Sequence, residues 1–488
     1  MVKVFVQKYR SMPIQLRASI WFLLCSFLQK GVSMITTPVF TRIMSTKEYG
    51  QYGTFSSWLG IVTILISLNM YLGVHAQGIV KFSDEHEKFT SSIEGLTTML
   101  ASVWMIIYVL FRNFWNELLS MTTPQVLAMV VIIWSTAIFN FWANEQRLKY
   151  TYKALVIVTL LVSIIKPVFE FLLVVQSNEK VTARVLGWMI VDFAAYSWMH
   201  LFHLIKGKTF FSRKYWRYAL LFSIPLIPHY LSATILNSAD RIMIKEMIGE
   251  GESGIYNLAY SVAIIMTLFS TALSQTVTPW MYQKIKAKKN KEIAPIAYVS
   301  LIIIAIANLL LIVFAPEVIR VFAPKEYYEA VWIIPPVSMS CYFLFSYDLF
   351  AKYAFYYEKT KIIMLVSIIG AMMNIVLNLV FIRIFGYIAA GYTTLICYII
   401  FASFHYLLMR YVCRNYCEKD YPYDTRIVLV ISVIFILVGF FFLFLYTNTF
   451  LRYIVILLVV LTSAIFHKKI KYAVVTIVRI RKNDITNS

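Results

Sequence analysis

Charged residues are scarce in this chain of 488 residues: 14% are Asp, Glu, Lys or Arg, against about 25% in soluble domains. Cysteine is also rare, with five in an odd-numbered set that argues against a disulfide framework. Cys413 and Cys417 have no second pair nearby, so their spacing does not indicate zinc. These deficits exclude an ordinary soluble enzyme, a disordered chain, collagen and a coiled coil.

Apolar residues are in excess, at 60% hydrophobic and 16% aromatic. A membrane-spanning helix needs about 20 apolar residues, and the chain contains fourteen apolar stretches on that scale. The sequence therefore predicts an all-α, polytopic integral membrane protein with about fourteen transmembrane helices. The expected spans are 18–41, 51–76, 94–111, 124–144, 153–175, 181–205, 218–243, 254–282, 294–314, 330–350, 362–382, 386–409, 427–446 and 452–467.

The basic residues predict the orientation of these spans. Lys and Arg outnumber Asp and Glu by 45 to 24, and most fall in connections that share one side when the N-terminus is cytoplasmic. Segments 206–217 and 284–291 are the most basic. Because cytoplasmic loops of membrane proteins are rich in Lys and Arg, this excess indicates topology rather than nucleic-acid binding. We expect both termini in the cytoplasm and an uncleaved first helix.

A faint internal repeat suggests two lobes. Residues 41–52 and 240–256 share Arg-Ile-Met followed by Gly-x-Tyr, about 200 residues apart. That separation corresponds to six spans, so the repeat is parallel. The expected division is an N-lobe (1–205), a cytoplasmic linker (206–217), a C-lobe (218–409), two further spans (410–467) and a basic cytoplasmic tail (468–488).

Five titratable residues fall near the middle of expected spans: Lys30, Lys166, Glu170, Asp192 and His229. Such residues are costly in a bilayer and usually mark function. Lys166 and Glu170 are four residues apart, which predicts an ion pair on one helix face. Lys30 and Asp192 have no partner nearby in the sequence. His229 fits either a packing role or a functional one.

These charges predict a substrate class, with structural ion pairing as the open alternative. Cations that face a closed cavity attract an anionic headgroup such as a diphosphate. The candidates are Lys30 and Lys166, with Arg42, Arg184 and Arg241 at outer span ends. Carboxylates or histidine in the same cavity can hold a coupling ion, and the candidates are Asp192, Glu170 and His229.

Several enzyme and metal motifs fail. Gly207-Lys208-Thr209 resembles the end of a phosphate loop, but Phe202 stands where that loop needs glycine. His200 and His203 are three residues apart at an inner helix end, without further ligands in the nearby sequence. We expect neither a metal, nor a cofactor, nor an enzyme active site.

Three segments resemble a known family: TPVFTRIMSTKEYGQYGTF (37–55), NEQRLKYTYKAL (144–155) and NSADRIMIKEMIGEGESGIYNLAYSV (237–262). Together with the fourteen spans, they are similar to the polysaccharide transporter family of the multidrug/oligosaccharidyl-lipid/polysaccharide superfamily, and specifically to Wzx-type flippases. The resemblance implies a V-shaped, two-lobed bundle in the bacterial inner membrane that works by alternating access.

The resemblance also implies a substrate and partners. Such flippases move undecaprenyl-diphosphate-linked oligosaccharides to the outer leaflet for O-antigen, capsule or exopolysaccharide synthesis, with H⁺ or Na⁺ as coupling ion. The resemblance further implies that the protein is a monomer. Its candidate partners are a polysaccharide polymerase and a chain-length regulator. Two alternatives remain: a cation-coupled multidrug exporter, and a membrane polymerase or glycosyltransferase, which the short outside connections disfavour.

Overall fold

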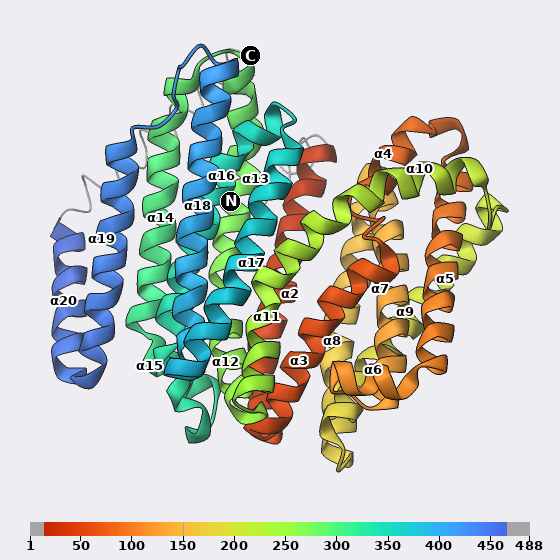
Figure 1. Ribbon diagram of the computed structural model, residues 1–488, viewed down its shortest axis with the longest axis horizontal. Helices are drawn as coiled ribbons and strands as arrows, with labels where there is room; N and C mark the ends of the chain where they lie inside the picture. The colour runs from red at the N-terminus through yellow and green to blue at the C-terminus, as the bar shows by residue number, and fades with distance from the viewer. Residues whose placement is uncertain (1–13, 150, 466–488) are drawn as a thin grey trace, which may run out of the picture. The chain divides into compact units, whose positions relative to one another are not determined.

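The computed structural model describes residues 14–149 and 151–465, apart from the side chains of a few helical positions (Figure 1). All regular secondary structure in this part of the chain is helical. The fold divides into two compact units, Met1–Asn257 and Leu258–Ser488. The all-α membrane architecture predicted from the sequence is confirmed.

In its described residues, the first unit has ten α-helices and the start of an eleventh, joined by short turns. Helix α9 is its centre, because it packs against α5, α7 and α8. The helices are α2 (Ile14–Ile43), α3 (Thr46–Ser67), α4 (Val74–Lys81), α5 (His86–Leu110), α6 (Arg112–Leu119), α7 (Thr123–Leu148), α8 (Tyr152–Gln176), α9 (Lys180–Gly207), α10 (Arg213–Ser223), α11 (Ile227–Met247) and the start of α12 (Glu250–Ala263).

The second unit is built around α16, which packs against α13, α14 and α18. Its helices are the rest of α12, then α13 (Met266–Lys286), α14 (Ile293–Val313), α15 (Ala315–Phe322), α16 (Ile334–Tyr356), α17 (Thr360–Phe385), α18 (Ala389–Tyr416), α19 (Thr425–Phe444) and α20 (Thr449–Ile465), with short 3₁₀ turns Asn290–Glu292, Lys325–Trp332 and Leu445–Thr447.

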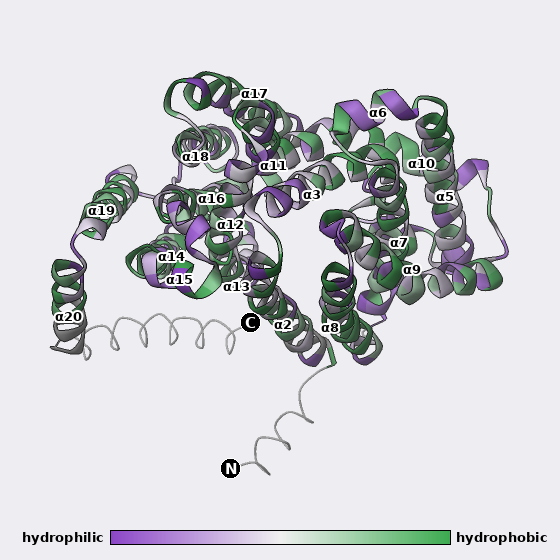
Figure 2. Ribbon diagram, turned by 90° about the horizontal axis from the view of Figure 1, so that it is seen from below, coloured by the Kyte–Doolittle hydropathy of each residue, from purple (hydrophilic) through white to green (hydrophobic). Residues whose placement is uncertain are grey.

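Helix covers most of every predicted span. By length and composition, ten helices of the described residues can cross a membrane, or eleven if the bent pair Lys325–Trp332 and Ile334–Tyr356 is one span. Three further helices, α2, α3 and α20, lie at expected spans but are not among these ten or eleven. Figure 2 shows apolar residues along most of the long helices and hydrophilic residues gathered on connections such as α6.

The outer face of α8 shows why these helices need lipid. Large aliphatic side chains on this face are about half exposed, namely Ile157, Leu161, Ile164, Ile165 and Val168. A soluble protein rarely leaves such a continuous apolar face in water. Because the hydrocarbon core of a bilayer accepts it without cost, the face fits a membrane-embedded helix.

Several predicted spans are interrupted, two of them at residues whose backbone explains the break. The stretch 51–76 is helical only to Ser67, because Leu68 and Asn69 adopt left-handed backbone angles (φ 50° and 47°) that end the helix. The stretch 218–243 is split into α10 and α11 by the 3₁₀ turn Ile224–Leu226. Pro225 explains that split, since it lacks the N–H that a continuing helix would use.

The two copies of the repeat motif contact one another within the first unit. A Cβ on Gly50 would lie 1.9 Å from the Glu250 carbonyl oxygen, and one on Gly254 would lie 2.0 Å from the Thr46 carbonyl oxygen. Only glycine fits at either position, because the backbones of α3 and α12 touch there. The glycine of the Gly-x-Tyr pattern is therefore required in both copies by a close contact between the two helices.

Candidate functional site

The middle of α8 and α9 holds a buried ion pair. The Lys166 Nζ lies 2.6 Å from Asp192 Oδ1, and Trp188 Nε1 donates to Asp192 Oδ2 at 2.8 Å. Trp188 and Asp192 are one helical turn apart on α9, so both reach the same point. The Lys166 ammonium also lies 5.1 Å from the Trp188 ring centroid, a cation–π distance. Each oxygen of the Asp192 carboxylate thus faces one neighbour, the Lys166 ammonium or the Trp188 indole N–H.

A second ion pair joins the same two helices closer to their connecting turn. Arg184 Nε donates to Glu170 Oε2 at 3.3 Å. The guanidinium carbon lies 3.7 Å from the Phe40 ring centroid and 3.6 Å from that of Tyr52. Two aromatic faces and a carboxylate surround this cation, which suits the flat, weakly hydrated guanidinium better than an ammonium.

The predicted pair between Lys166 and Glu170 is wrong. Both residues lie on α8, but each finds its partner on α9, across the helix interface. Gly187 permits this exchange, because a Cβ there would lie 3.0 Å from the Glu170 Cα and push the helices apart. Spacing within one helix shows which residues share a face, whereas the neighbouring helix decides which of them meet.

In both pairs the cation is the more exposed member. The Lys166 side chain is 24% exposed and that of Asp192 2%. The corresponding values are 10% for Arg184 and 6% for Glu170. A group approaching the first pair therefore meets Lys166 before Asp192, whereas both members of the second pair are buried.

The other candidates lie on different helices. Lys30 falls in α2, and its side chain is outside the described residues. Arg42 is exposed at the end of α2 and donates to the Pro38 carbonyl at 2.8 Å. Arg241 on α11 is half-buried and donates to the Asn237 carbonyl at 2.9 Å. The half-buried His229 lies beside the proline break of α11. Of the eight candidates, four are brought together: Lys166, Glu170, Arg184 and Asp192.

A third polar centre, which sequence reasoning missed, lies toward the other end of α9. The Glu94 side chain, on α5, is fully buried. One of its carboxylate oxygens lies 2.9 Å from His200 Nδ1 and the other 2.5 Å from His203 Nδ1. Each oxygen of a buried carboxylate is therefore held by its own imidazole.

The cluster extends to α7. His203 Nε2 lies 3.7 Å from Glu145 Oε2, and Lys149 Nζ lies 3.4 Å from the same oxygen. His203 Nε2 itself has no hydrogen-bond partner among the described residues. His75 on α4 faces the same region and pairs with the Thr90 hydroxyl at 3.1 Å.

This third polar centre is called here the Glu94–histidine cluster, and it consists of Glu94, Glu145, Lys149, His200 and His203. The described residues contain no group of three or more His, Cys, Asp or Glu that could hold a metal ion. Beyond the cluster along α5 and α9, Glu87 and Lys206 pair with one another at 3.8 Å.

The i, i+3 spacing of His200 and His203 was the signal available in the sequence. It placed both rings on one face of a helix. The sequence interpretation found no further ligand, because Glu94 stands at the edge of an expected span more than 100 residues earlier. The packing of α5 against α9 brings these residues together.

Comparison with known proteins decides the family. The model of the polysaccharide biosynthesis protein family matches residues 16–285, more than half of the chain. The chain belongs to this family. The family model described as MatE matches residues 225–380. The resemblance predicted from the sequence is therefore confirmed at the level of the family.

Two curated relatives come from Haemophilus influenzae. An Lsg locus protein is 22% identical over 381 residues, which cover 73% of this chain and 88% of the relative. An uncharacterized membrane protein is 21% identical over 372 residues, which cover 72% of this chain and 86% of the relative. Both matches extend over most of this chain and most of the relative.

Solved structures show the same fold. The lipid II flippase MurJ in an inward closed conformation has a TM-score of 0.67 and 16% identity, and the match covers 92% of this chain and all of that one. An inward-facing multidrug resistance transporter of the MATE family has a TM-score of 0.63 and 12% identity, covering 80% and 96%. This chain therefore has the fold shared by a lipid flippase and multidrug transporters.

Proposed function

We propose that this protein is a flippase that moves undecaprenyl-diphosphate-linked oligosaccharide repeat units from the inner to the outer leaflet of a bacterial cytoplasmic membrane. The product would serve O-antigen, capsule or exopolysaccharide synthesis. The family match and the likeness to a lipid II flippase support this assignment. We expect transport rather than catalysis, cytoplasmic termini, and a monomer that works beside a polymerase and a chain-length regulator.

The observation that carries the proposal is the polarity of the two ion pairs. Lys166 and Arg184 are each more exposed than the carboxylate they neutralise. A diphosphate headgroup would be attracted by such sites, because Lys and Arg are the usual partners of phosphate oxygens. A cationic drug would require the reverse order, with the carboxylate more exposed.

A reconstituted flipping assay tests the function. The full-length protein in vesicles receives fluorescent undecaprenyl-diphosphate oligosaccharide in both leaflets, and a membrane-impermeant quencher reports how much becomes accessible. We expect complete quenching with protein and about half quenching with empty vesicles. Half quenching with protein present would contradict the flippase.

The second candidate is a cation-coupled multidrug exporter, favoured by the MatE match over residues 225–380. Loading the same vesicles with a fluorescent cationic dye separates the two. Dye efflux driven by an ion gradient, without lipid scrambling, would assign the exporter. Lipid movement without dye efflux would assign the flippase.

For the coupling ion, we propose a proton held by the Glu94–histidine cluster. Asp192, Glu170 and His229 were the candidates from sequence, but Asp192 and Glu170 each already face a cation. Each of those pairs is neutral as it stands, and protonating the carboxylate would strand a buried cation. Stranding a buried charge is costly, so the two pairs are poor proton carriers.

The Glu94–histidine cluster has the opposite balance. It contains two carboxylates and one ammonium, so it carries net negative charge while both imidazoles are neutral. One added proton on an imidazole neutralises the buried set, and imidazole titrates near neutral pH. The bare Nε2 of His203, facing Glu145, is the position that can accept it.

A further inference from the structure

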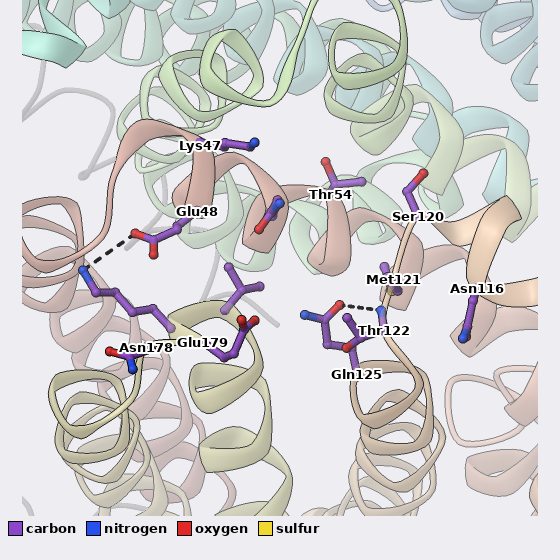
Figure 3. A pocket seen from close by; sticks show the side chains of 13 residues that line it. Lys47, Glu48, Thr54, Asn116, Ser120, Met121, Thr122, Gln125, Asn178 and Glu179 are labelled. Carbon is purple, nitrogen blue, oxygen red and sulfur yellow. Dashed lines mark hydrogen bonds and ion pairs between the residues drawn. The ribbon is translucent and has the colours of Figure 1, made fainter.

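A polar cavity of about 540 Å³ lies within the first unit. Figure 3 shows side chains from three segments around it: the start of α3, then α6 with its turn into the start of α7, and the turn between α8 and α9 with the start of α9. Its size falls within the usual range for small-molecule sites, about 300–1,000 Å³. The volume is enough for a ligand of a few rings.

The lining of this cavity is polar but electrically balanced. Two lysines, Lys47 and Lys180, and two glutamates, Glu48 and Glu179, line it. The rest of the polar lining is amide and hydroxyl: Gln51, Thr54, Asn116, Ser120, Thr122, Gln125 and Asn178. A diphosphate would select a net positive site. Amides and hydroxyls, which both donate and accept, instead match the hydroxyl groups of a sugar.

The amides are held in place before any ligand arrives. The Gln125 Oε1 accepts from the Thr122 backbone N–H at 3.1 Å, and its Nε2 donates to Thr182 Oγ1 at 3.0 Å. The Asn116 Nδ2 donates to Thr123 Oγ1 at 3.0 Å. Such fixed polar groups reduce the ordering cost of binding.

Thr54 supplies the observation that points to a ligand. Its side chain lines the cavity, the residue is only 2% exposed, and Oγ1 has no hydrogen-bond partner among the described residues. Buried hydroxyls are nearly always paired, because an unpaired one loses its bonds to water without replacement. Turning the Thr54 side chain toward the cavity would let a sugar hydroxyl complete that bond.

We propose that this cavity is a subsite for uncharged sugar residues of the transported oligosaccharide, separate from the paired cations that face the diphosphate. This assignment rests on the proposed flippase function. In the predicted topology the α8–α9 turn is extracytoplasmic, so the subsite holds sugars on the side where the product is released. The headgroup and the glycan are thus recognised by different parts of the same unit.

Binding of a lipid-free glycan tests the subsite. The probe is the oligosaccharide cut by mild acid from the producing strain's own lipid-linked intermediate, titrated calorimetrically into the full-length protein in detergent. Thr54→Val removes the unpaired hydroxyl at constant shape, and we expect about tenfold weaker binding, the size of one buried hydrogen bond. Asn178→Trp fills the cavity from an exposed turn, and we expect binding to be lost.

Thr63→Val is the matched control. Thr63 lies on the same helix, its hydroxyl already donates to the Leu59 carbonyl at 2.6 Å, and it does not line the cavity. We expect it to bind glycan like the wild type. Wild-type binding by both Thr54→Val and Asn178→Trp would overturn the subsite, as would competition by inorganic pyrophosphate for the same cavity.

The flipping assay keeps the two proposals apart. Glycan binding that depends on Thr54, in a protein that moves no lipid-linked oligosaccharide, would support the subsite and contradict the flippase. Lipid flipping with glycan binding indifferent to Thr54 and Asn178 would support the flippase and contradict the subsite.

Discussion

The two halves of α9 neutralise buried charge in different ways. Toward the α8–α9 turn, Lys166 neutralises Asp192 and Arg184 neutralises Glu170, one cation for each carboxylate. Toward the other end, Glu94 is surrounded by imidazoles instead of permanent cations. Permanent pairs hold a fixed charge in place, whereas imidazoles allow the charge to change with pH. The difference separates a region suited to holding an anion from one suited to binding a proton.

The largest effect is expected from Glu94→Gln. The change removes the charge for which the imidazoles carry a proton, so the cluster no longer needs one. We expect flipping driven by a pH gradient to fall at least tenfold, toward the rate without a gradient. The measurement is lipid flipping in vesicles with an imposed pH gradient.

Glu85→Gln is the control for that variant. Glu85 lies just before α5 and accepts a hydrogen bond from the Tyr215 hydroxyl, outside the cluster. It should leave the gradient response unchanged. An undiminished response in Glu94→Gln would remove the cluster from the coupling mechanism.

The next effect concerns stability. Lys166→Met leaves the Asp192 carboxylate buried without its cation, which typically costs about 3–5 kcal/mol. The double variant Lys166→Met/Asp192→Asn removes both charges and should recover most of that loss. Thermal unfolding in detergent measures both. Equal unfolding temperatures for the single and the double variant would show that the pair is not a coupled unit.

Arg184→Lys probes the second pair more gently. Lysine keeps the charge but loses the flat contact with Phe40 and Tyr52, which is worth about 1–2 kcal/mol in a desolvated setting. We expect a modest drop in unfolding temperature. We expect the flipping rate to fall by more than this small loss of stability would explain. A variant indistinguishable from wild type in both assays would show that charge alone matters here.

The smallest effect separates the two imidazoles. His200 Nε2 lies 3.5 Å from the Thr98 hydroxyl, whereas His203 connects Glu94 to Glu145. His203→Gln should therefore flatten the pH dependence of flipping. His200→Gln should shift that dependence without removing it. The reverse ranking would assign the proton to His200.

Much of the fold was predictable from the sequence, because spans of apolar residues are a strong signal in a membrane protein. Helix interruptions were not. The left-handed residues Leu68 and Asn69 carry no strong sequence mark, and the span expected over 218–243 ran through Pro225 without a break. Element positions follow from composition, whereas breaks depend on local backbone geometry.

The candidate site was likewise predictable only in part from the sequence. Lys166, Glu170, Arg184 and Asp192 were all identified as costly charges within or beside a span, and the structure brings them together. Their pairing was predicted incorrectly, because it is set by the register of α8 against α9. Glu94 was missed, since nothing in its own neighbourhood of sequence indicates two histidines from a distant helix.

The most direct test of this account is the ratio of flipping with a pH gradient to flipping without one, measured in matched vesicles for three proteins. Because it is a ratio, it separates coupling from substrate affinity. The account predicts a high ratio for wild type and for Lys166→Met/Asp192→Asn, and a ratio near one for Glu94→Gln. A ratio that stays high in Glu94→Gln but falls to one in the double variant would place the coupling proton on Asp192 and contradict the account.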